Sequence, residues 1–123
     1  MSYDVRVLAD VRELDMPALL AVDPELGRVV AGIVRELKSD PWLGVEMRER
    51  MRLAVLADCR KVAFDLPSWR DKPRFRLVYR NDPHDGSIAV VTVVAVGPRS
   101  ELAAYKQAAT RIGAQQREQP QWR

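Results

Sequence analysis

The chain has 123 residues and a mass of 14.0 kDa, which allows one hydrophobic core and is too short for two ordinary domains. Hydrophobic residues make up 47% of it and charged residues 30%, so a core can offset the ordering entropy without disulfides or a structural metal. The lone Cys59 excludes disulfide scaffolds and zinc ribbons. Since there is no long apolar run and no signal-peptide pattern at the start, a cytoplasmic protein is expected.

The net charge of +3 is unevenly distributed along the chain. Residues 1–59 contain 8 Lys/Arg and 11 Asp/Glu, a net charge of −3, whereas residues 60–123 contain 12 and 6, a net charge of +6. A basic second half suits a polyanionic partner such as nucleic acid, and it equally suits an acidic protein. Charge alone leaves both partners open.

The first half of the chain predicts one strand and two helices. Period-two alternation over residues 3–8 is typical of a strand with one buried face. Pro17 suits a first helical turn, so a helix is expected from about Asp15. A longer helix follows the capping residue Asp23, with apolar positions at helical spacing up to Leu37. Residues 45–56 fit either a short helix or an extended connector.

The second half predicts three strands and a last helix. Residues 60–66 and 74–80 alternate with period two on either side of a turn-rich segment, and residues 88–96 form an apolar, β-branched run typical of a central strand. Ser100 can cap a short helix that ends near Ile112. The order β-α-α-β-β-β-α predicts a single α+β domain over residues 1–112 with a small antiparallel sheet, and a flexible tail over residues 113–123.

Several catalytic sets are excluded because their residues are missing. With one histidine and one cysteine, the chain has no Cys/His metal cluster and no convincing nucleophile pair, so no metal or cofactor is expected. His84 lies in a turn-forming segment and is interpreted as a solvated turn residue. Cys59 is interpreted as a small buried hydrophobe.

What remains is a set of cations on two predicted strands. If these strands pair as antiparallel neighbours, Lys61 and Arg76 share the face opposite Phe64 and Phe75. That face is either the solvated side of a strand, with long stems covering apolar surface, or a nucleic-acid site. Charge and periodicity alone do not decide between the two.

An ordered series of motifs then resembles a known family. The series comprises Asp58-Cys59-Arg60-Lys61-Val62, Phe75-Arg76-Leu77-Val78-Tyr79, Val94-Ala95-Val96-Gly97-Pro98-Arg99, and Tyr105 followed by Ala109 and Arg111-Ile112. It resembles the RelE/ParE toxin superfamily of type II toxin–antitoxin systems, and in particular its RelE branch. The specificity comes from the order of the motifs, which spans the folded chain, and not from any one of them.

The resemblance implies a small antiparallel sheet with two N-terminal helices on one face and a C-terminal helix near the other. It also implies an endoribonuclease, an mRNA interferase that cleaves mRNA in the ribosomal A site without a metal, inhibits translation and is bound by a cognate antitoxin in a hetero-oligomer. No membrane partner is implied. By position in the motifs, the catalytic residues would be Lys61, Arg76, Arg99 and Tyr105.

In one position the sequence departs from RelE itself. Ala63 stands where RelE has a second lysine, to which proton delivery to the leaving group is ascribed. Arg70 and Lys72, in the longer segment between the two strands, are a hypothesis for the missing cation, and their joint replacement by alanine without loss of RNA cleavage would remove it. The residues expected to bind RNA are Arg60, Arg70, Lys72, Arg74 and Arg80.

Two other functions remain open on the same fold. One is a ParE-like toxin that poisons DNA gyrase, although the presence of both Lys61 and Tyr105 speaks against it. The other is a toxin-fold module that has lost catalysis through the change at Ala63 and only binds an antitoxin. Incubation with translating ribosomes and with gyrase separates all three.

Overall fold

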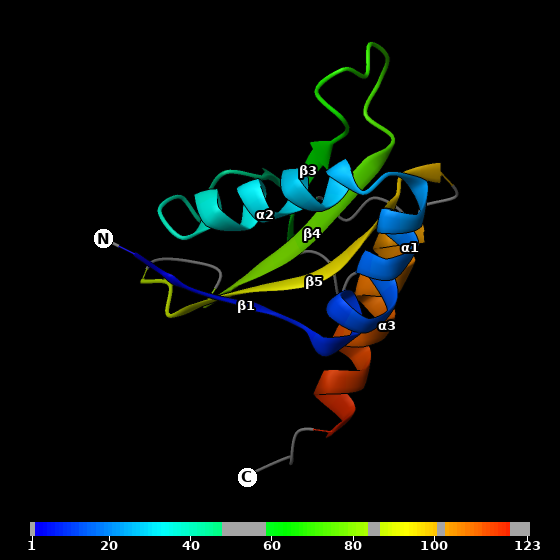
Figure 1. Ribbon diagram of the computed structural model, residues 1–123. Helices are drawn as coiled ribbons and strands as arrows, with labels where there is room; N and C mark the ends of the chain where they lie inside the picture. The colour runs from blue at the N-terminus through cyan, green and yellow to red at the C-terminus, as the bar shows by residue number, and fades with distance from the viewer. Residues whose placement is uncertain (1, 48–58, 84–86, 101–102, 119–123) are drawn as a thin grey trace, which may run out of the picture.

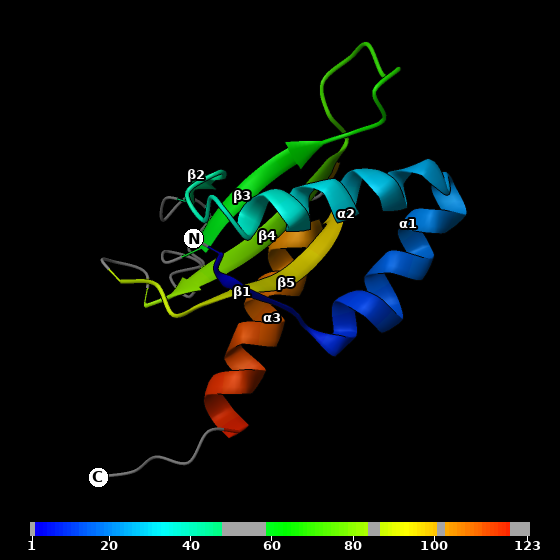
Figure 2. The same ribbon diagram turned by 60° about the vertical axis from the view of Figure 1, so that its left-hand side comes forward.

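The computed structural model describes residues 2–47, 59–83, 87–100 and 103–118 (Figure 1). Its elements are β1 (Asp4–Val7), the π-helical turn η1 (Val11–Asp15), α1 (Met16–Val22), α2 (Glu25–Leu37), β2 (Val45–Glu46), β3 (Cys59–Phe64), β4 (Phe75–Asp82), β5 (Val90–Pro98) and α3 (Ala103–Glu118). The five strands form one sheet in the order β1-β5-β4-β3-β2. Helices α1 and α2 cover one face and α3 lies against the other (Figure 2). The α+β prediction is therefore confirmed.

The sheet is mixed, which corrects the expectation of a purely antiparallel one. Strands β3, β4 and β5 form the predicted antiparallel meander, but β1 pairs with β5 in parallel, with Val5 opposite Val91. Alternation of apolar and polar residues is the same for either direction of a strand. The sequence pattern therefore located β1 but could not give its direction.

The two N-terminal helices form the apolar layer over one face of the sheet. The Asp23 carboxylate accepts a hydrogen bond of 2.8 Å from the backbone N–H of Glu25, as expected of a capping residue. The helical path starts earlier than predicted, since η1 precedes α1. Pro17 has no N–H to donate, so the regular helical bonding is already incomplete at this junction.

Two apolar clusters lie on either side of the sheet. The cluster under α1 and α2 is large and contains Phe64, Phe75, Leu77 and Tyr79, the last two fully buried. The cluster under α3 is smaller and rich in alanine; its buried members are Met47, Cys59, Val78, Val94, Ala95, Ala104, Tyr105, Ala108 and Ile112. Cys59 is 1% exposed, as its interpretation as a small hydrophobe requires.

The segment before β2 is fixed by the buried Tyr79. The Tyr79 hydroxyl donates to the carbonyl oxygen of Pro41 and accepts from the N–H of Gly44, both at 2.8 Å. A β-carbon on Gly44 would lie 2.7 Å from the carbonyl oxygen of Lys61, so only glycine fits there. Val45 and Glu46 then pair with β3 in extended form, and residues 48–56, the rest of the segment expected to be a helix or a connector, lie outside the described residues.

The last helix is longer than predicted. It runs from Ala103 to Glu118, past the predicted end near Ile112. Gly113 is unfavourable inside a helix by roughly 1 kcal/mol, but the following alanine, glutamine and arginine residues are good helix formers. His84 and residues 119–123 lie outside the described residues. In the described part of the chain, no helix is long and apolar enough to cross a membrane.

Candidate functional site

One face of the sheet is only partly covered. Helix α3 packs on β5 and β4 and approaches β5 closely at Gly97, where a β-carbon would lie 2.6 Å from Oε1 of Gln107 and 3.6 Å from Ala104. Ala63, on β3, is exposed. The fold therefore leaves a strip of sheet beside α3 open to solvent.

The predicted cations Lys61 and Arg76 lie on this open strip. Lys61 pairs with Val78 across the β3–β4 ladder, and Ala63 pairs with Arg76. Residues directly opposite in an antiparallel pair point to the same face, and Val78 belongs to the cluster under α3. The expectation that Lys61 and Arg76 share a face is confirmed.

Tyr105 reaches the same place from α3. The Nζ atom of Lys61 lies 5.5 Å from the centroid of the Tyr105 ring, a cation–π contact. Tyr105 is only 5% exposed, so it forms the wall of the open strip and not its surface. Two residues 44 positions apart in the sequence are thereby brought into contact.

Arg76 is held at the base of the β3–β4 hairpin. Its Nη1 atom donates to the carbonyl oxygens of Pro73 at 3.0 Å and Phe75 at 2.8 Å. In the described part of the chain, its Nε and Nη2 atoms make no hydrogen bond. Because a guanidinium carries five N–H donors in a fixed plane, Arg76 retains donors for a bound oxyanion.

Arg99 lies near the same end of the sheet. Its backbone N–H donates to the carbonyl oxygen of Arg74 at 2.7 Å, which continues the ladder beyond the Arg76–Gly97 pair. Its side chain is exposed. The structure thus brings Lys61 against Tyr105, and it places Arg76 on β4 and Arg99 just beyond the end of β5, at the same end of the sheet.

Two of the cations expected to bind RNA are occupied elsewhere. Arg60 points to the opposite face, where it donates to the carbonyl oxygens of Gly44 at 2.9 Å and Trp42 at 3.3 Å and lies over the Trp42 ring. Arg74 forms a two-pronged ion pair with Asp65, with both bonds at 2.9 Å. Each of these arginines fixes a loop.

The Asp65–Arg74 pair closes the base of the β3–β4 hairpin. The Arg74 side chain lowers the pKa of Asp65 to about 2, and the Asp65 carboxylate raises the pKa of Arg74. Arg70 and Lys72 lie beyond this pair with exposed side chains, on the projecting part of the hairpin. Arg80 lies on the same face as Arg76, opposite Cys59, at the far end of the open strip.

The most extensive polar network was not predicted from the sequence. The buried Asp15 carboxylate accepts two bonds from Arg111, at 2.6 and 2.7 Å, one from Gln107 at 3.0 Å and one from the N–H of Val96 at 2.8 Å. Arg111 also donates to the carbonyl oxygen of Val94 at 3.0 Å. Asp15 raises the pKa of Arg111. The network ties η1, β5 and α3 together.

This network replaces a missing stretch of strand pairing. The backbone ladder between β1 and β5 ends where the N–H of Leu8 donates to the carbonyl oxygen of Val93. Beyond that point the edge of β5 is bonded by the side chains of Asp15 and Arg111. The sequence does contain a signal that Asp15 is buried. It lies four residues from Val11 and four from Leu19, so all three residues share one buried helical face.

A cavity of about 180 Å³ opens beside this network. It lies between α1 and α3 at the end of β5, and Oε1 of Gln107 is buried there with no hydrogen-bond partner among the described residues. Its apolar walls are Leu14, Ala18, Leu19, Val22, Phe75, Val96 and Pro98. Among the described residues, no group of three or more His, Cys, Asp or Glu side chains could hold a metal ion.

Comparison with known proteins identifies the architecture. No protein-family model and no curated protein sequence matches the chain. Among solved structures, it is similar to a mutant of the Escherichia coli toxin RelE in the free state, with a TM-score of 0.59 and 20% sequence identity, over 91% of this chain and 99% of the other. The chain has the RelE fold. The predicted resemblance is thus supported at the level of the RelE fold over nearly the whole of both chains.

Proposed function

We propose that the protein is a toxin of the RelE type that cleaves mRNA on the ribosome and so inhibits translation. The observation that carries this proposal is the contact between Lys61 and Tyr105 on the open strip, in the same face as Arg76. These residues come from three separated motifs, and the RelE fold of the chain agrees with that reading.

The proposed reaction uses a nucleophile that RNA itself supplies. The 2′-OH attacks the adjacent phosphorus, the P–O5′ bond breaks, and the products are a 2′,3′-cyclic phosphate and a 5′-hydroxyl. The proton lost from the 2′-OH is balanced by the proton gained by the leaving 5′-oxygen. Negative charge builds up on the phosphorane oxygens, so fixed cations stabilise the transition state more than the ground state.

We assign the roles from the motif positions together with the contacts that each side chain makes. Arg76, with free donors and a fixed guanidinium, binds the scissile phosphate and stabilises its transition-state charge together with Lys61. Tyr105, in the wall of the open strip, holds Lys61 through its ring. Its hydroxyl is assigned to the 2′-OH from the position of Tyr105 in the motif series. Arg99, exposed at the end of β5, contacts the phosphate or protonates the leaving oxygen.

Ala63 leaves room for a cation in this arrangement. It is exposed and lies directly opposite Arg76 in the ladder. No lysine stands at this position, so leaving-group protonation falls to Arg99, to water or to a group of the ribosome. Arg70 and Lys72, on the neighbouring hairpin, remain the hypothesis for a replacement.

The proposed partners are the ribosome with its mRNA and a cognate antitoxin protein. An antitoxin that covers the open strip, or adds a strand at the β2 edge, would form a hetero-oligomer and block the cations. Such a toxin acts where translation takes place, so we place the protein in the cytoplasm.

The direct test is cleavage on translating ribosomes. Purified protein is added to a translation reaction with a defined mRNA, and the new RNA ends are mapped with and without EDTA. We expect A-site cuts with 2′,3′-cyclic phosphate ends, unaffected by EDTA, lost in Arg76→Ala and retained in Arg28→Ala, an exposed arginine on α2. DNA breaks with gyrase would indicate the ParE-like function, and neither activity would indicate a binding module.

A further inference from the structure

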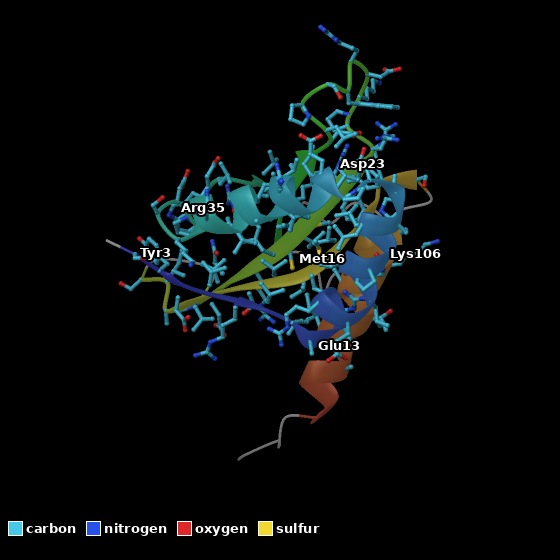
Figure 3. All side chains as sticks on the ribbon, viewed as in Figure 1. Tyr3, Glu13, Met16, Asp23, Arg35 and Lys106 are labelled. Atoms are coloured by element: carbon cyan, nitrogen blue, oxygen red, sulfur yellow. The ribbon has the colours of Figure 1, made fainter. Side chains whose placement is uncertain are left out.

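The β3–β4 hairpin is an ordered projection that stands clear of the sheet. Figures 1 and 2 show it extending beyond the ends of β3 and β4, away from the helices. Asp65 and Arg74 close its base, and the Asp65 carboxylate also accepts the N–H groups of Leu66 and Arg74. Asp23 lies at the α1–α2 junction (Figure 3), and its negative charge contributes to raising the pKa of Arg74. The hairpin is therefore prearranged without burial in a core.

Trp69 is the large side chain of this hairpin. Its backbone N–H donates to Leu66 at 3.0 Å, and its indole Nε1 donates to the carbonyl oxygen of Lys72 at 3.1 Å. The Arg74 guanidinium lies 3.6 Å from the centroid of the ring, which covers one face. The residue nevertheless stays 39% exposed and belongs to neither apolar cluster. An oriented indole is thus presented to solvent.

Two cations follow this exposed ring in the sequence. Arg70 and Lys72 are exposed, and their side chains form no ion pair in the described part of the chain. Asp71 lies between them, and its carboxylate accepts the N–H of Lys72 at 2.9 Å. The tip therefore combines an aromatic surface with a net positive charge, which suits a base and its neighbouring phosphates.

The hairpin is continuous with the proposed cleavage site. Arg76 donates to the carbonyl oxygen of Pro73, at the base of the hairpin, and Ala63 lies two residues before Asp65. The base of the hairpin therefore adjoins Arg76, the residue proposed to bind the scissile phosphate.

We propose that Trp69 is a stacking platform for an unpaired base of single-stranded RNA, with Arg70 and Lys72 contacting the adjacent phosphates. The inference rests on the proposed function for the choice of RNA as the ligand. It adds a binding subsite outside the reacting atoms: Arg74 and Asp65 position the ring, and the open face of the indole receives the base. Because every base has a π-face, the platform tolerates sequence variation.

The test measures binding apart from cleavage. In a Trp42→Phe, Trp122→Phe background, Trp69 is the sole tryptophan, and a single-stranded oligoadenylate with 2′-O-methyl riboses cannot be cleaved. We expect the oligonucleotide to quench Trp69 fluorescence. In the otherwise unchanged protein, Trp69→Leu should weaken binding about 5- to 150-fold by anisotropy, whereas Trp69→Phe should retain most of it. Arg70→Ala with Lys72→Ala should reduce the salt dependence of binding.

The matched control is Trp42, which among the described residues also has an arginine over its ring. Trp42 is 45% exposed and lies under Arg60 on the opposite side of the sheet, so Trp42→Leu should leave RNA binding unchanged. Equal effects of the two leucine variants, or equal quenching by inorganic polyphosphate, would overturn the platform. The platform would also be overturned if Trp69→Leu bound RNA normally but no longer bound a purified antitoxin. That result would make the hairpin a protein-docking site. If the unchanged protein cleaves mRNA on the ribosome but Trp69→Leu binds the oligonucleotide equally well, only this inference is refuted. If the oligonucleotide quenches Trp69 fluorescence but the protein does not cleave mRNA, only the proposed function is refuted.

Discussion

The two faces of the sheet differ in how completely they are covered by helices and in what their side chains do. The face under α1 and α2 is closed by large apolar side chains such as Phe64, Phe75 and Leu77, which serve stability. The face under α3 has a smaller apolar cluster that is rich in alanine. It leaves Lys61 and Arg76 beside the part of the sheet that α3 does not cover. The comparison teaches that one β-strand can serve both: in β4, alternate residues belong to the core and to the candidate site.

The largest effect is expected where the two layers are joined at the edge of β5. Asp15→Ala should lower the free energy of unfolding by about 3 to 5 kcal/mol, because it leaves the buried Arg111 charge with only the longer pair to the exposed Asp10. Urea denaturation measures this. Asp10→Ala is the control, since Asp10 is exposed and 3.6 Å from Arg111, and should cost less than about 1 kcal/mol. Similar losses in both would show that the buried network does not join the layers.

The next effect tests the closed face alone. Leu77→Ala removes a fully buried side chain and should cost about 2 to 5 kcal/mol of stability. The rate of RNA cleavage per folded molecule should stay unchanged, because Leu77 faces away from the open strip. Denaturation and cleavage measured on the same sample check both statements. A specific loss of cleavage at constant folded fraction would contradict the division between the faces.

The open face should show the reverse behaviour. Arg76→Ala should reduce ribosome-dependent cleavage by about 100-fold or more, as expected for the loss of one fixed charge donor to the transition state. Its unfolding free energy should change by less than about 1 kcal/mol, since Arg76 is only partly buried. Mapped RNA ends and urea curves give the two values. Unimpaired cleavage would exclude Arg76 from the site.

A gain of activity is expected from restoring the second lysine. Ala63→Lys places an ammonium on an exposed position opposite Arg76, and should raise the cleavage rate about tenfold if it supplies the leaving-group proton. Ala31→Lys, on the exposed side of α2, adds the same charge elsewhere and should have no effect. Equal rates for both variants and the unchanged protein would mean that another group already protonates the leaving oxygen.

The smallest effect concerns the hairpin that adjoins the open face. The pKa of Asp65 is about 2 in the folded protein against an ordinary value of 3.8, so its pair with Arg74 stabilises the fold above pH 3.8. That contribution is lost as the pH falls through 3.8 toward 2. The urea midpoint of Asp65→Asn should therefore depend less on pH in this window than that of the unchanged protein. Parallel curves would show that the pair does not contribute to folding stability.

Much of the fold could be predicted because the pattern is local. Alternation located β3 and β4, an apolar β-branched run located β5, and helical spacing located α2. Antiparallel pairing put Lys61 and Arg76 on one face. What could not be predicted depends on contacts distant in the sequence. The direction of β1 is set by its partner, and the ion pair of Asp15 joins residues 96 positions apart. The engagement of Arg60 and Arg74 by loops was likewise invisible to charge counting.

Gly44 has a consequence for how the open strip can change over time. Gly44 lies so close to the backbone of Lys61 on β3 that a single methyl group there would collide with its carbonyl oxygen. A shift of that strand would move the ammonium relative to the Tyr105 ring while every charged residue stayed in place. The position of the lysine can therefore be changed by substitutions at uncharged residues, and a change in what the open strip binds can begin at a residue outside the strip.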